Sequence, residues 1–203
     1  ELIVATGSRS FVPDNFPTQA RNFFTVRQRE DIDGMRQYLA QPTRVCIVGG
    51  GLLGLEMADA LHQLGHEVEV IQIADRLMSR QLDALSADLL QELLTLKGIH
   101  ITLNDEVVEF MQTDGMITHT RLKSGRVSEV GLVLGAIGTR ANTEILQAAG
   151  VRCARGVLVN SRLQTSDPNI HAIGEIAELG GETWGISSAA VEQANILARV
   201  LTG

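Results

Sequence analysis

Three glycines after a short apolar run are the residues whose spacing predicts chemistry most directly. The run from Val45 to Val48 has the composition of a buried strand, and the turn that follows it contains Gly49, Gly51 and Gly54. A helix with apolar spacing is expected from Leu52 to Leu64. A strand, a G-x-G-x-x-G turn and a helix in this order are typical of proteins that hold a dinucleotide pyrophosphate at a helix N-terminus.

Each glycine of this turn has a separate physical reason. Gly49 permits the tight turn, Gly51 lets the backbone approach the pyrophosphate, and Gly54 lets helix and strand pack closely. The helix then begins with Leu52 and Leu53, whose backbone N–H groups have no acceptor within the helix. We therefore predict that the three glycines and these two leucines bind phosphate.

A second apolar strand, from Val68 to Ile73, ends where a residue that contacts the ribose is expected. That residue is Gln72, although a carboxylate is the usual partner of the 2′-hydroxyl. Glutamine can still hydrogen-bond a hydroxyl and does not repel a 2′-phosphate, so the choice between NADH and NADPH stays open. Arg76 and Arg80 follow in a loop, where an arginine can bind such a phosphate or simply be solvated.

The composition is that of an ordinary globular protein with an acidic balance. Hydrophobic residues make up 44% of the 203 residues, charged residues 20%, and the formal net charge is −7. This charge argues against nucleic acid or an anionic membrane surface as a main partner. No apolar run is long enough to span a bilayer, and nothing resembles a signal peptide. A cytoplasmic location is expected.

The cysteines and histidines give no sign of a metal or thiol centre. Cys46 lies within the first predicted strand and is expected in the core, whereas Cys153 lies in a polar stretch. Neither cysteine belongs to a CxxC motif or to a spacing with histidine that suits a metal. We predict no metal site in this chain.

Two further helices are expected before and after the glycine turn. Pro13 and Pro17 mark a linker, and a short amphipathic helix is expected from Glu30 to Leu39. The other helix is expected to begin after Asp83 and to close at Gly98. Its predicted inward face consists of Leu85, Leu89, Leu93 and Leu96.

From Glu106 the hydrophobic period changes to two, which predicts an antiparallel β-meander with turns at 113–115 and 124–125. The last elements expected are a helix at 187–201 and strands at 99–103, 130–137, 156–159 and 170–175.

Four motifs, in this order, resemble the FAD- and NAD(P)-dependent pyridine nucleotide-disulfide oxidoreductase family. Ala-Thr-Gly at 5–7 is similar to the exit of its first FAD segment, and residues 49–56 are similar to its NAD(P) motif. Residues 136–138 resemble its return strand, and residues 165–175 its second FAD motif. Within the family, residues 77–83 and Gly174-Glu175 look like the flavin module of NAD(P)H-dependent nitrite reductase large subunits, with rubredoxin and ferredoxin reductases as close neighbours.

The resemblance implies an α/β fold, with a Rossmann-like NAD(P)-binding domain that has a central parallel sheet and an antiparallel β-meander. Partial FAD-binding segments flank this domain. The implied ranges are 1–34 for a partial FAD segment and linker, 35–145 for the NAD(P)-binding domain and 146–203 for a second partial FAD segment. The chain starts within a strand and without Met, so we expect a piece of a longer protein.

The same resemblance implies further cofactor-binding residues. Glu56 is expected near the nicotinamide, and Gly138, with Ile137, beside the nicotinamide-side phosphates or ribose. Glu175 is expected to hydrogen-bond the ribityl chain of FAD. The FAD segments also contain Thr6, Gly7 and Gly174.

The activity implied is hydride transfer from NAD(P)H to FAD, and onward electron transfer to a redox centre or acceptor protein. The cofactors carry this chemistry, so no catalytic side chain is named. The chain alone is expected to be inactive and not to retain FAD, because the family's amino-terminal FAD fingerprint is missing from it. The alternatives are a rubredoxin or ferredoxin reductase and a nucleotide-binding module without electron transfer. A homodimer is also considered as an assembly. A thiol–disulfide reductase would need a redox-active pair of cysteines, which this chain does not contain.

Overall fold

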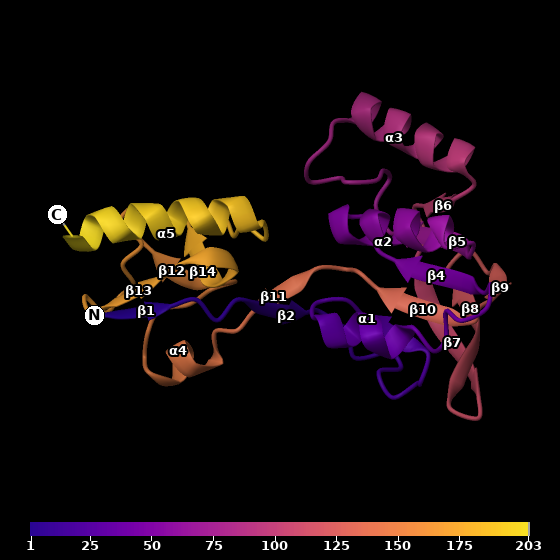
Figure 1. Ribbon diagram of the computed structural model, residues 1–203, viewed down its shortest axis with the longest axis horizontal. Coiled ribbons are helices and arrows are strands. Elements are labelled where there is room, and N and C mark those ends of the chain that lie inside the picture. The colour runs from indigo at the N-terminus through magenta and orange to yellow at the C-terminus, as the bar shows by residue number, and fades with distance from the viewer. Residues whose placement is uncertain (203) are drawn as a thin grey trace. The chain divides into compact units, whose positions relative to one another are not determined.

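The computed structural model describes residues 1–202, which divide into two compact units (Figure 1). The continuous unit is Ser10–Gly138, and the discontinuous unit combines Glu1–Arg9 with the chain from Thr139 onward. Residues 10–34, predicted as FAD segment and linker, lie in the continuous unit because β3 (Phe23–Thr25) joins its sheet. The assignment of the units to NAD(P) and FAD stays a prediction.

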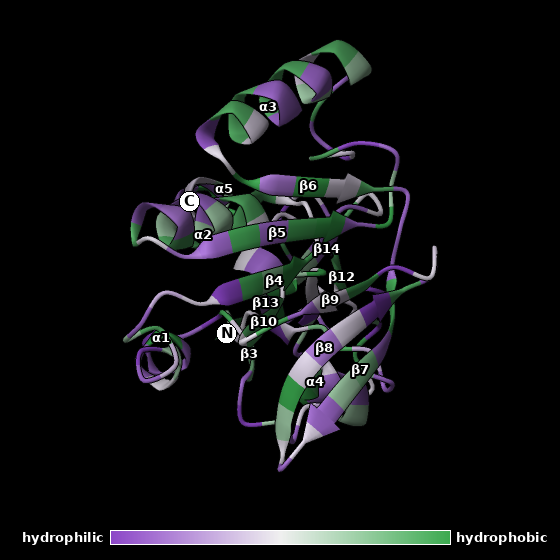
Figure 2. Ribbon diagram, turned by 90° about the vertical axis from the view of Figure 1, so that its right-hand side faces the viewer, coloured by the Kyte–Doolittle hydropathy of each residue, from purple (hydrophilic) through white to green (hydrophobic). Residues whose placement is uncertain are grey.

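The continuous unit is built on one five-stranded parallel sheet, as predicted. Its strand order is β3-β10-β4-β5-β6, and neighbouring strands lie side by side in Figure 2. The strands after β3 are β4 (Arg44–Val48), β5 (Glu67–Gln72), β6 (His100–Leu103) and β10 (Leu132–Gly135). From β4 the chain proceeds to β5 and β6 on one side, whereas β10 and β3 lie on the other side. The sheet therefore has a topological switch point between β4 and β10.

Alternate side chains of the strands pack into two hydrophobic cores, one on each face of the sheet. Val45 and Ile47 point to a core shared with helices, and Cys46 and Val48 point to a core shared with the meander. The helices are α1 (Arg29–Met35), α2 (Leu52–Gln63) and α3 (Ala84–Lys97). The meander is β7 (Val107–Thr113), β8 (Met116–Leu122) and β9 (Val127–Glu129), antiparallel as predicted.

The inward face predicted for α3 is wrong, although its ends are as expected. The Asp83 carboxylate accepts the Ser86 N–H at 2.8 Å, and Gly98 closes the helix with φ 99°. The buried residues are Ala87 and Leu94, while the four leucines predicted to face inward, Leu85, Leu89, Leu93 and Leu96, are 55–78% exposed. Leucines recur at helical spacing on two faces of this helix, so spacing alone did not distinguish them.

Two neighbouring leucines of α3 should therefore differ sharply in their effect on stability. Leu94→Ala, at a side chain 7% exposed, is expected to lower the free energy of unfolding by about 2 kcal/mol. Leu93→Ala, at a side chain 60% exposed, should stay within about 0.5 kcal/mol of the wild type. Urea unfolding of the two variants measures this difference, and equal losses would show that the orientation of α3 is wrong.

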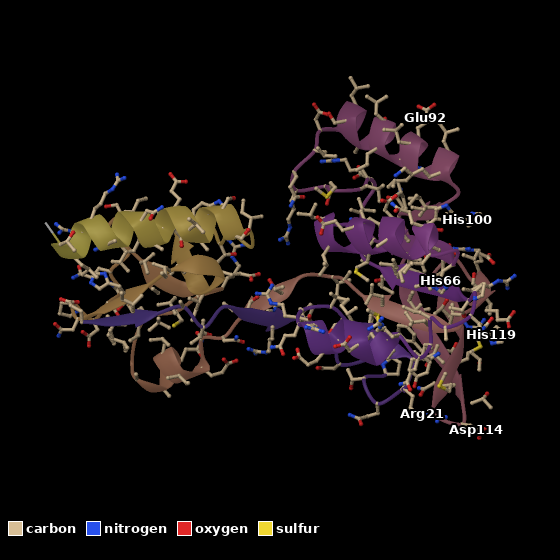
Figure 3. The ribbon with its side chains drawn as sticks, viewed as in Figure 1. Arg21, His66, Glu92, His100, Asp114 and His119 are labelled. Atoms are coloured by element: carbon tan, nitrogen blue, oxygen red, sulfur yellow. The ribbon has the colours of Figure 1, made fainter. Side chains whose placement is uncertain are left out.

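The segment before β3 is fixed by a buried asparagine. The Asn22 side chain donates to the carbonyls of Ile117 and Gly131, at 2.8 and 2.9 Å, and accepts the Ile117 N–H at 2.8 Å. Arg21 also donates to the Asp114 carbonyl at the tip of the β7–β8 hairpin, at 2.8 Å (Figure 3). Residues predicted as part of a linker thus join the meander to the sheet.

A buried histidine at the start of β5 makes stability depend on pH. His66 Nδ1 accepts the Thr43 N–H at 3.3 Å, and burial lowers the pKa of the imidazole from its ordinary 6.5 (Figure 3). The folded state therefore favours the neutral ring. Its stabilising contribution is complete above pH 6.5 and is lost as pH falls through the lower folded-state pKa.

We expect His66→Asn to flatten this dependence, because an amide oxygen can accept the same N–H without titrating. Between pH 7.5 and 5, the wild type should lose more thermal stability than the variant. Differential scanning calorimetry across this range makes the comparison, and equal losses would rule out His66 as the titrating group.

The discontinuous unit has short strands and one long helix. Strand β1 (Leu2–Val4) pairs in parallel with β13 (Ile170–Ala172), and β12 (Val157–Val159) with β14 (Ala177–Leu179). Strands β2 (Ser8–Ser10) and β11 (Thr139–Ala141) also pair. The helices are α4 (Glu144–Ala148), the short 3-10 helix η1 (Gly174–Ile176) and α5 (Ser187–Thr202). In the described part of the chain, no helix is long and apolar enough to cross a membrane.

Candidate functional site

The predicted glycine turn lies at the switch point of the parallel sheet. Gly49 directly follows β4, and its N–H donates to the Ile71 carbonyl of β5 at 2.8 Å. On the other side, Ala136 follows β10 and donates to the Val48 carbonyl at 2.8 Å. The carboxyl ends of β4, β5 and β10 therefore meet at this turn, where open parallel sheets bind their ligands.

Two of the three glycines are required by packing. Gly49 has φ 118°, and a Cβ there would lie 2.3 Å from the Ala136 carbonyl oxygen. A Cβ on Gly54 would lie 2.0 Å from the Gly49 carbonyl oxygen. Both contacts are with backbone atoms, which cannot move aside as a flexible side chain does. These residues let β4, β10 and α2 approach one another.

Gly51 differs, because a Cβ there would meet no atom within 4 Å. It is the N-cap of α2, has φ −87°, and no side chain caps the helix. Leu52 and Leu53 follow with exposed side chains, in the first turn where N–H groups lack acceptors within the helix. The space beside Gly51 is thus open toward the positive end of α2, which suits a pyrophosphate.

Gly50, which was not among the predicted site residues, holds the turn to the following loop. Its N–H donates to Gln72 Oε1 at 3.0 Å, and its carbonyl accepts the Met78 N–H at 2.9 Å. A Cβ on Gly50 would lie 2.7 Å from the buried side chain of Leu77. The sequence signal for Gly50 was the run of three consecutive glycines at 49–51. The G-x-G-x-x-G motif requires glycine at the first and third positions of this run but not at the second.

Both polar atoms of the Gln72 side chain therefore already have hydrogen-bond partners within the protein. While its Oε1 accepts the Gly50 N–H, its Nε2 donates to the Arg76 carbonyl at 3.4 Å. The side chain remains half-buried at the end of β5, where a contact with the ribose was predicted. It also lines a pocket of about 340 Å³ with mainly apolar walls, together with Val48, Gly49, Ile71, Phe16 and Ile137. Such a pocket suits one planar ring of a nucleotide.

The remaining predicted residues of this unit lie around the same sheet edge. Ile137 lines the pocket, and Gly138 follows with φ 111° and an exposed backbone. Glu56 lies exposed on α2, and Arg80 lies exposed in the loop after β5. Within residues 1–202, neither of these two charged side chains has a hydrogen bond or an ion pair.

A larger cavity of about 640 Å³ lies at the opposite end of the strands, beside Arg44, His100 and Arg126. The charged side chains that line this cavity already form ion pairs with one another. Arg126 binds both Glu69 and Thr102, and Arg44 binds Glu67 at 2.9 Å and Glu129 at 3.2 Å. At the glycine turn, in contrast, the N–H groups in the first turn of α2 lack acceptors within the helix.

The predicted FAD residues lie in the discontinuous unit, where two strand ends bring them to one edge. Because β1 and β13 are parallel neighbours, Thr6 and Gly7 after β1 lie on the same edge as Gly174 and Glu175 after β13. Thr6 and Gly7 bond Asn142 through their carbonyls, at 2.9 and 3.0 Å. Glu175 accepts from the Thr139 hydroxyl at 2.7 Å, and the Gly174 N–H donates to Gln193 at 2.6 Å.

The cysteines have the character of structural residues. Burial raises the pKa of the Cys46 thiol to about 12, so the group stays protonated in the core. Burial also raises the pKa of Cys153, which bonds the Val151 carbonyl. Among residues 1–202, no group of three or more His, Cys, Asp or Glu residues is placed to hold a metal ion.

Residues 1–194 match the family model described as pyridine nucleotide-disulphide oxidoreductase. The chain belongs to this family. Pyridine nucleotide-disulphide oxidoreductases use FAD and NAD(P)H, and the match confirms the resemblance drawn from the four motifs. The observed fold also agrees with the Rossmann-like α/β architecture expected for the family.

Relatives of this family match the chain over its full length. Nitrite reductase [NAD(P)H] of Bacillus subtilis (strain 168) is 38% identical, and the matched residues are 25% of that protein. Nitric oxide reductase FlRd-NAD(+) reductase of Vibrio vulnificus (strain YJ016) is 34% identical, with 53% of its length matched. The crystal structure of the ferredoxin reductase for the CYP199A2 system from Rhodopseudomonas palustris has a TM-score of 0.93 at 30% identity and is 52% covered. The chain thus spans a quarter to about half of these relatives.

Proposed function

We propose that this chain binds NAD(P)H at the glycine turn and positions it for hydride transfer to FAD in an oxidoreductase of the nitrite reductase large-subunit type. The observation that supports this most is the open N-terminus of α2 beside Gly51, at the switch point of the sheet. The 38% identity to a nitrite reductase [NAD(P)H] supports the choice of subtype.

The residues of the continuous unit have distinct roles in this proposal. The N–H groups of Leu52 and Leu53, with the open backbone at Gly51, bind the pyrophosphate. Gln72 borders the ribose, and the apolar pocket beside it takes one of the two ring systems. Gly138 and Ile137 line the nicotinamide side, and Glu56 orients the nicotinamide. When bound, the nicotinamide supplies the hydride, and no side chain of the chain is needed as acid or base.

The discontinuous unit contributes one rim of the FAD site. We assign Glu175 to the ribityl chain, and the backbone at Thr6, Gly7 and Gly174 to close approach of the flavin. The left-handed conformations of Gly7 (φ 63°) and Gly174 (φ 78°) support this, because they bring backbone rather than side chains to the edge. We expect the chain alone not to retain FAD and, without it, to be inactive in electron transfer.

A rubredoxin or ferredoxin reductase is the second candidate. Rubredoxin-NAD(+) reductase of Acinetobacter baylyi is also 38% identical, over 85% of this chain, and the ferredoxin reductase structure has a TM-score of 0.93. Both candidates share hydride transfer to FAD and differ in the electron acceptor.

Isothermal titration calorimetry with NADH and with FAD tests the binding part of this proposal. We expect NADH to bind to the purified protein and FAD not to bind. Gly51→Ala should weaken NADH binding at least about tenfold, because a methyl group enters the open space beside the phosphates. A folded protein that does not bind NADH would contradict the proposal. To separate the two candidates, oxidation of NADH by the FAD-loaded oxidoreductase that contains this chain is measured with nitrite, rubredoxin or ferredoxin as the acceptor.

A further inference from the structure

Helix α3 carries an apolar stripe on the side opposite its buried face. The stripe consists of four leucines, each more than half exposed: Leu85, Leu89, Leu93 and Leu96. Their spacing of four, four and three residues places them on one face of a helix. The buried residues, Ala87 and Leu94, lie on the other face. Figure 2 shows α3 beyond the edge strand β6, at one end of the sheet, and the stripe has no partner within residues 1–202.

The length of this stripe matches one helix laid against it. A single exposed leucine is ordinary on a protein surface, whereas a continuous apolar stripe marks a contact with another molecule. From Leu85 to Leu96 the stripe is about 16 Å long, or about three turns, at a rise of about 1.5 Å per residue. An amphipathic helix presents an apolar face of this length and width.

One edge of the stripe is acidic. Asp88 and Glu92 each stand one position before a leucine of the stripe, so both carboxylates lie along the same edge (Figure 3). Both side chains are exposed, and neither has a hydrogen bond or an ion pair within residues 1–202. Like charges four residues apart on a helix repel each other, so a cation beside both would relieve the repulsion. Lys97, near the other edge, is already bound to Asp59 of α2 at 2.7 Å.

This charge pattern distinguishes between the possible occupants of the stripe. Antiparallel pairing with a second copy of the chain would oppose leucine to leucine, but it would also bring Asp88 of one copy beside Glu92 of the other, where like charges repel. An anionic lipid surface is repelled by the same two carboxylates. A helix with an apolar face and basic residues beside that face complements both the leucines and the charges.

We propose that α3 is a docking surface for a partner protein that contributes an amphipathic helix with a basic edge. The apolar face of that helix covers the four leucines, and its Lys or Arg side chains pair with Asp88 and Glu92, as flanking charges do between the helices of a coiled coil. No residue of α3 lines the pocket at the glycine turn, so this inference goes beyond the proposed function and does not depend on it.

Two synthetic helical peptides of about three heptads test this surface. Both have a leucine stripe, and one carries Lys and the other Glu at the positions beside it. Each is labelled with a fluorophore and used at concentrations where it is monomeric. Fluorescence anisotropy measures binding to the purified protein at an ionic strength of about 0.15 M, which screens distant charges. We expect the Lys peptide to bind with a Kd below about 100 μM, at least about tenfold more tightly than the Glu peptide.

Two double variants of α3 separate the apolar contact from the charges. Leu89→Gln combined with Leu93→Gln keeps the helix propensity and should weaken binding of the Lys peptide at least about tenfold. Asp88→Lys combined with Glu92→Lys should reverse the preference, so that the Glu peptide binds more tightly than the Lys peptide. All four positions are exposed, and thermal unfolding confirms that each variant is folded.

Matched controls lie on the discontinuous unit. Ile145→Gln changes an exposed apolar side chain of α4. Glu182→Lys combined with Glu192→Lys, at two exposed positions, changes the net charge by the same amount as the reversal on α3. Both controls should leave the Kd of the Lys peptide within about threefold of the wild type.

Several results would overturn the inference. These are no binding of the Lys peptide to the folded wild type at about 1 mM, equal affinity for the two peptides, or an affinity that the leucine variants do not change. The last result would indicate unspecific attraction of a cationic peptide to an acidic protein. Sedimentation velocity and flotation with phosphatidylcholine vesicles examine the other occupants. Dimers or vesicle binding that the leucine variants abolish, without binding of the Lys peptide, would assign the stripe to a second copy or to a lipid surface instead.

Discussion

Gly49→Ala is expected to lower the free energy of unfolding by about 4 kcal/mol. Two effects add up at this position. The residue has φ 118°, where an L side chain costs about 1–2 kcal/mol, and its Cβ would lie 2.3 Å from the Ala136 carbonyl oxygen. Relief of that contact requires β4 and β10 to separate, which is overpacking at a cost of about 1–3 kcal/mol.

Urea unfolding measures this effect, and Gly65→Ala is the matched control. Gly65 also has a positive φ, 88°, but a Cβ there would meet no atom within 4 Å. It should therefore show the conformational cost alone, about 1–2 kcal/mol. If Gly49→Ala were no worse than Gly65→Ala, the close approach of the two strands at the turn would be wrong.

Asn22→Ala is expected to cost about 3–5 kcal/mol, an effect of similar size from a different cause. The side chain is fully buried and pairs with three backbone groups, the Ile117 N–H and the carbonyls of Ile117 and Gly131. Its removal takes the acceptor from the Ile117 N–H and a donor from each of the two carbonyls, and each buried polar group left without a partner costs about 1–3 kcal/mol. The meander should then separate from the sheet.

Asn15→Ala is the control for this change, since Asn15 is exposed and its side chain makes no hydrogen bond within residues 1–202. We expect it to stay within about 0.5 kcal/mol of the wild type. Both free energies come from urea titration monitored by circular dichroism. A loss below about 1 kcal/mol for Asn22→Ala would contradict this prediction, because it would mean that water hydrogen-bonds the three backbone groups in place of the asparagine.

The elements around the glycine turn could be predicted from sequence because their signals are local. Strand β4, the turn and α2 follow each other within 20 residues, and Gly49 and Gly54 are required by backbone atoms of the return strand and of the turn itself. Asp83 and Gly98 fixed the ends of α3 for the same reason, through bonds to residues within four positions.

The contacts that sequence could not reveal join distant parts of the chain. Asn22 bonds residues 95 and 109 positions away, so nothing near it separates a structural asparagine from a linker residue. The prediction of the buried face of α3 was wrong for a related reason. Leu94 and Leu93 are equally apolar, and only the sheet beneath the helix decides which is buried.

Gln72 is a residue whose position could be predicted from the sequence but whose hydrogen-bond partner could not. Its position at the end of β5 was predicted, and its role as a ribose contact remains a prediction. Its bond to Gly50 depends on the exact path of the turn, which follows from the tertiary packing of Leu77 against Gly50. Sequence gives the residue type, whereas the structure gives the partner.

The most direct measurement of where the nucleotide binds is a two-dimensional amide NMR titration with NADH. We expect the largest shifts at Gly51, Leu52 and Leu53, where the free N–H groups of α2 meet the pyrophosphate. The amide signals of Arg44, His100 and Arg126, which line the larger polar cavity at the other end of the strands, should not move. Shifts confined to that cavity, with the amides of α2 unchanged, would contradict the assignment of the dinucleotide to the glycine turn.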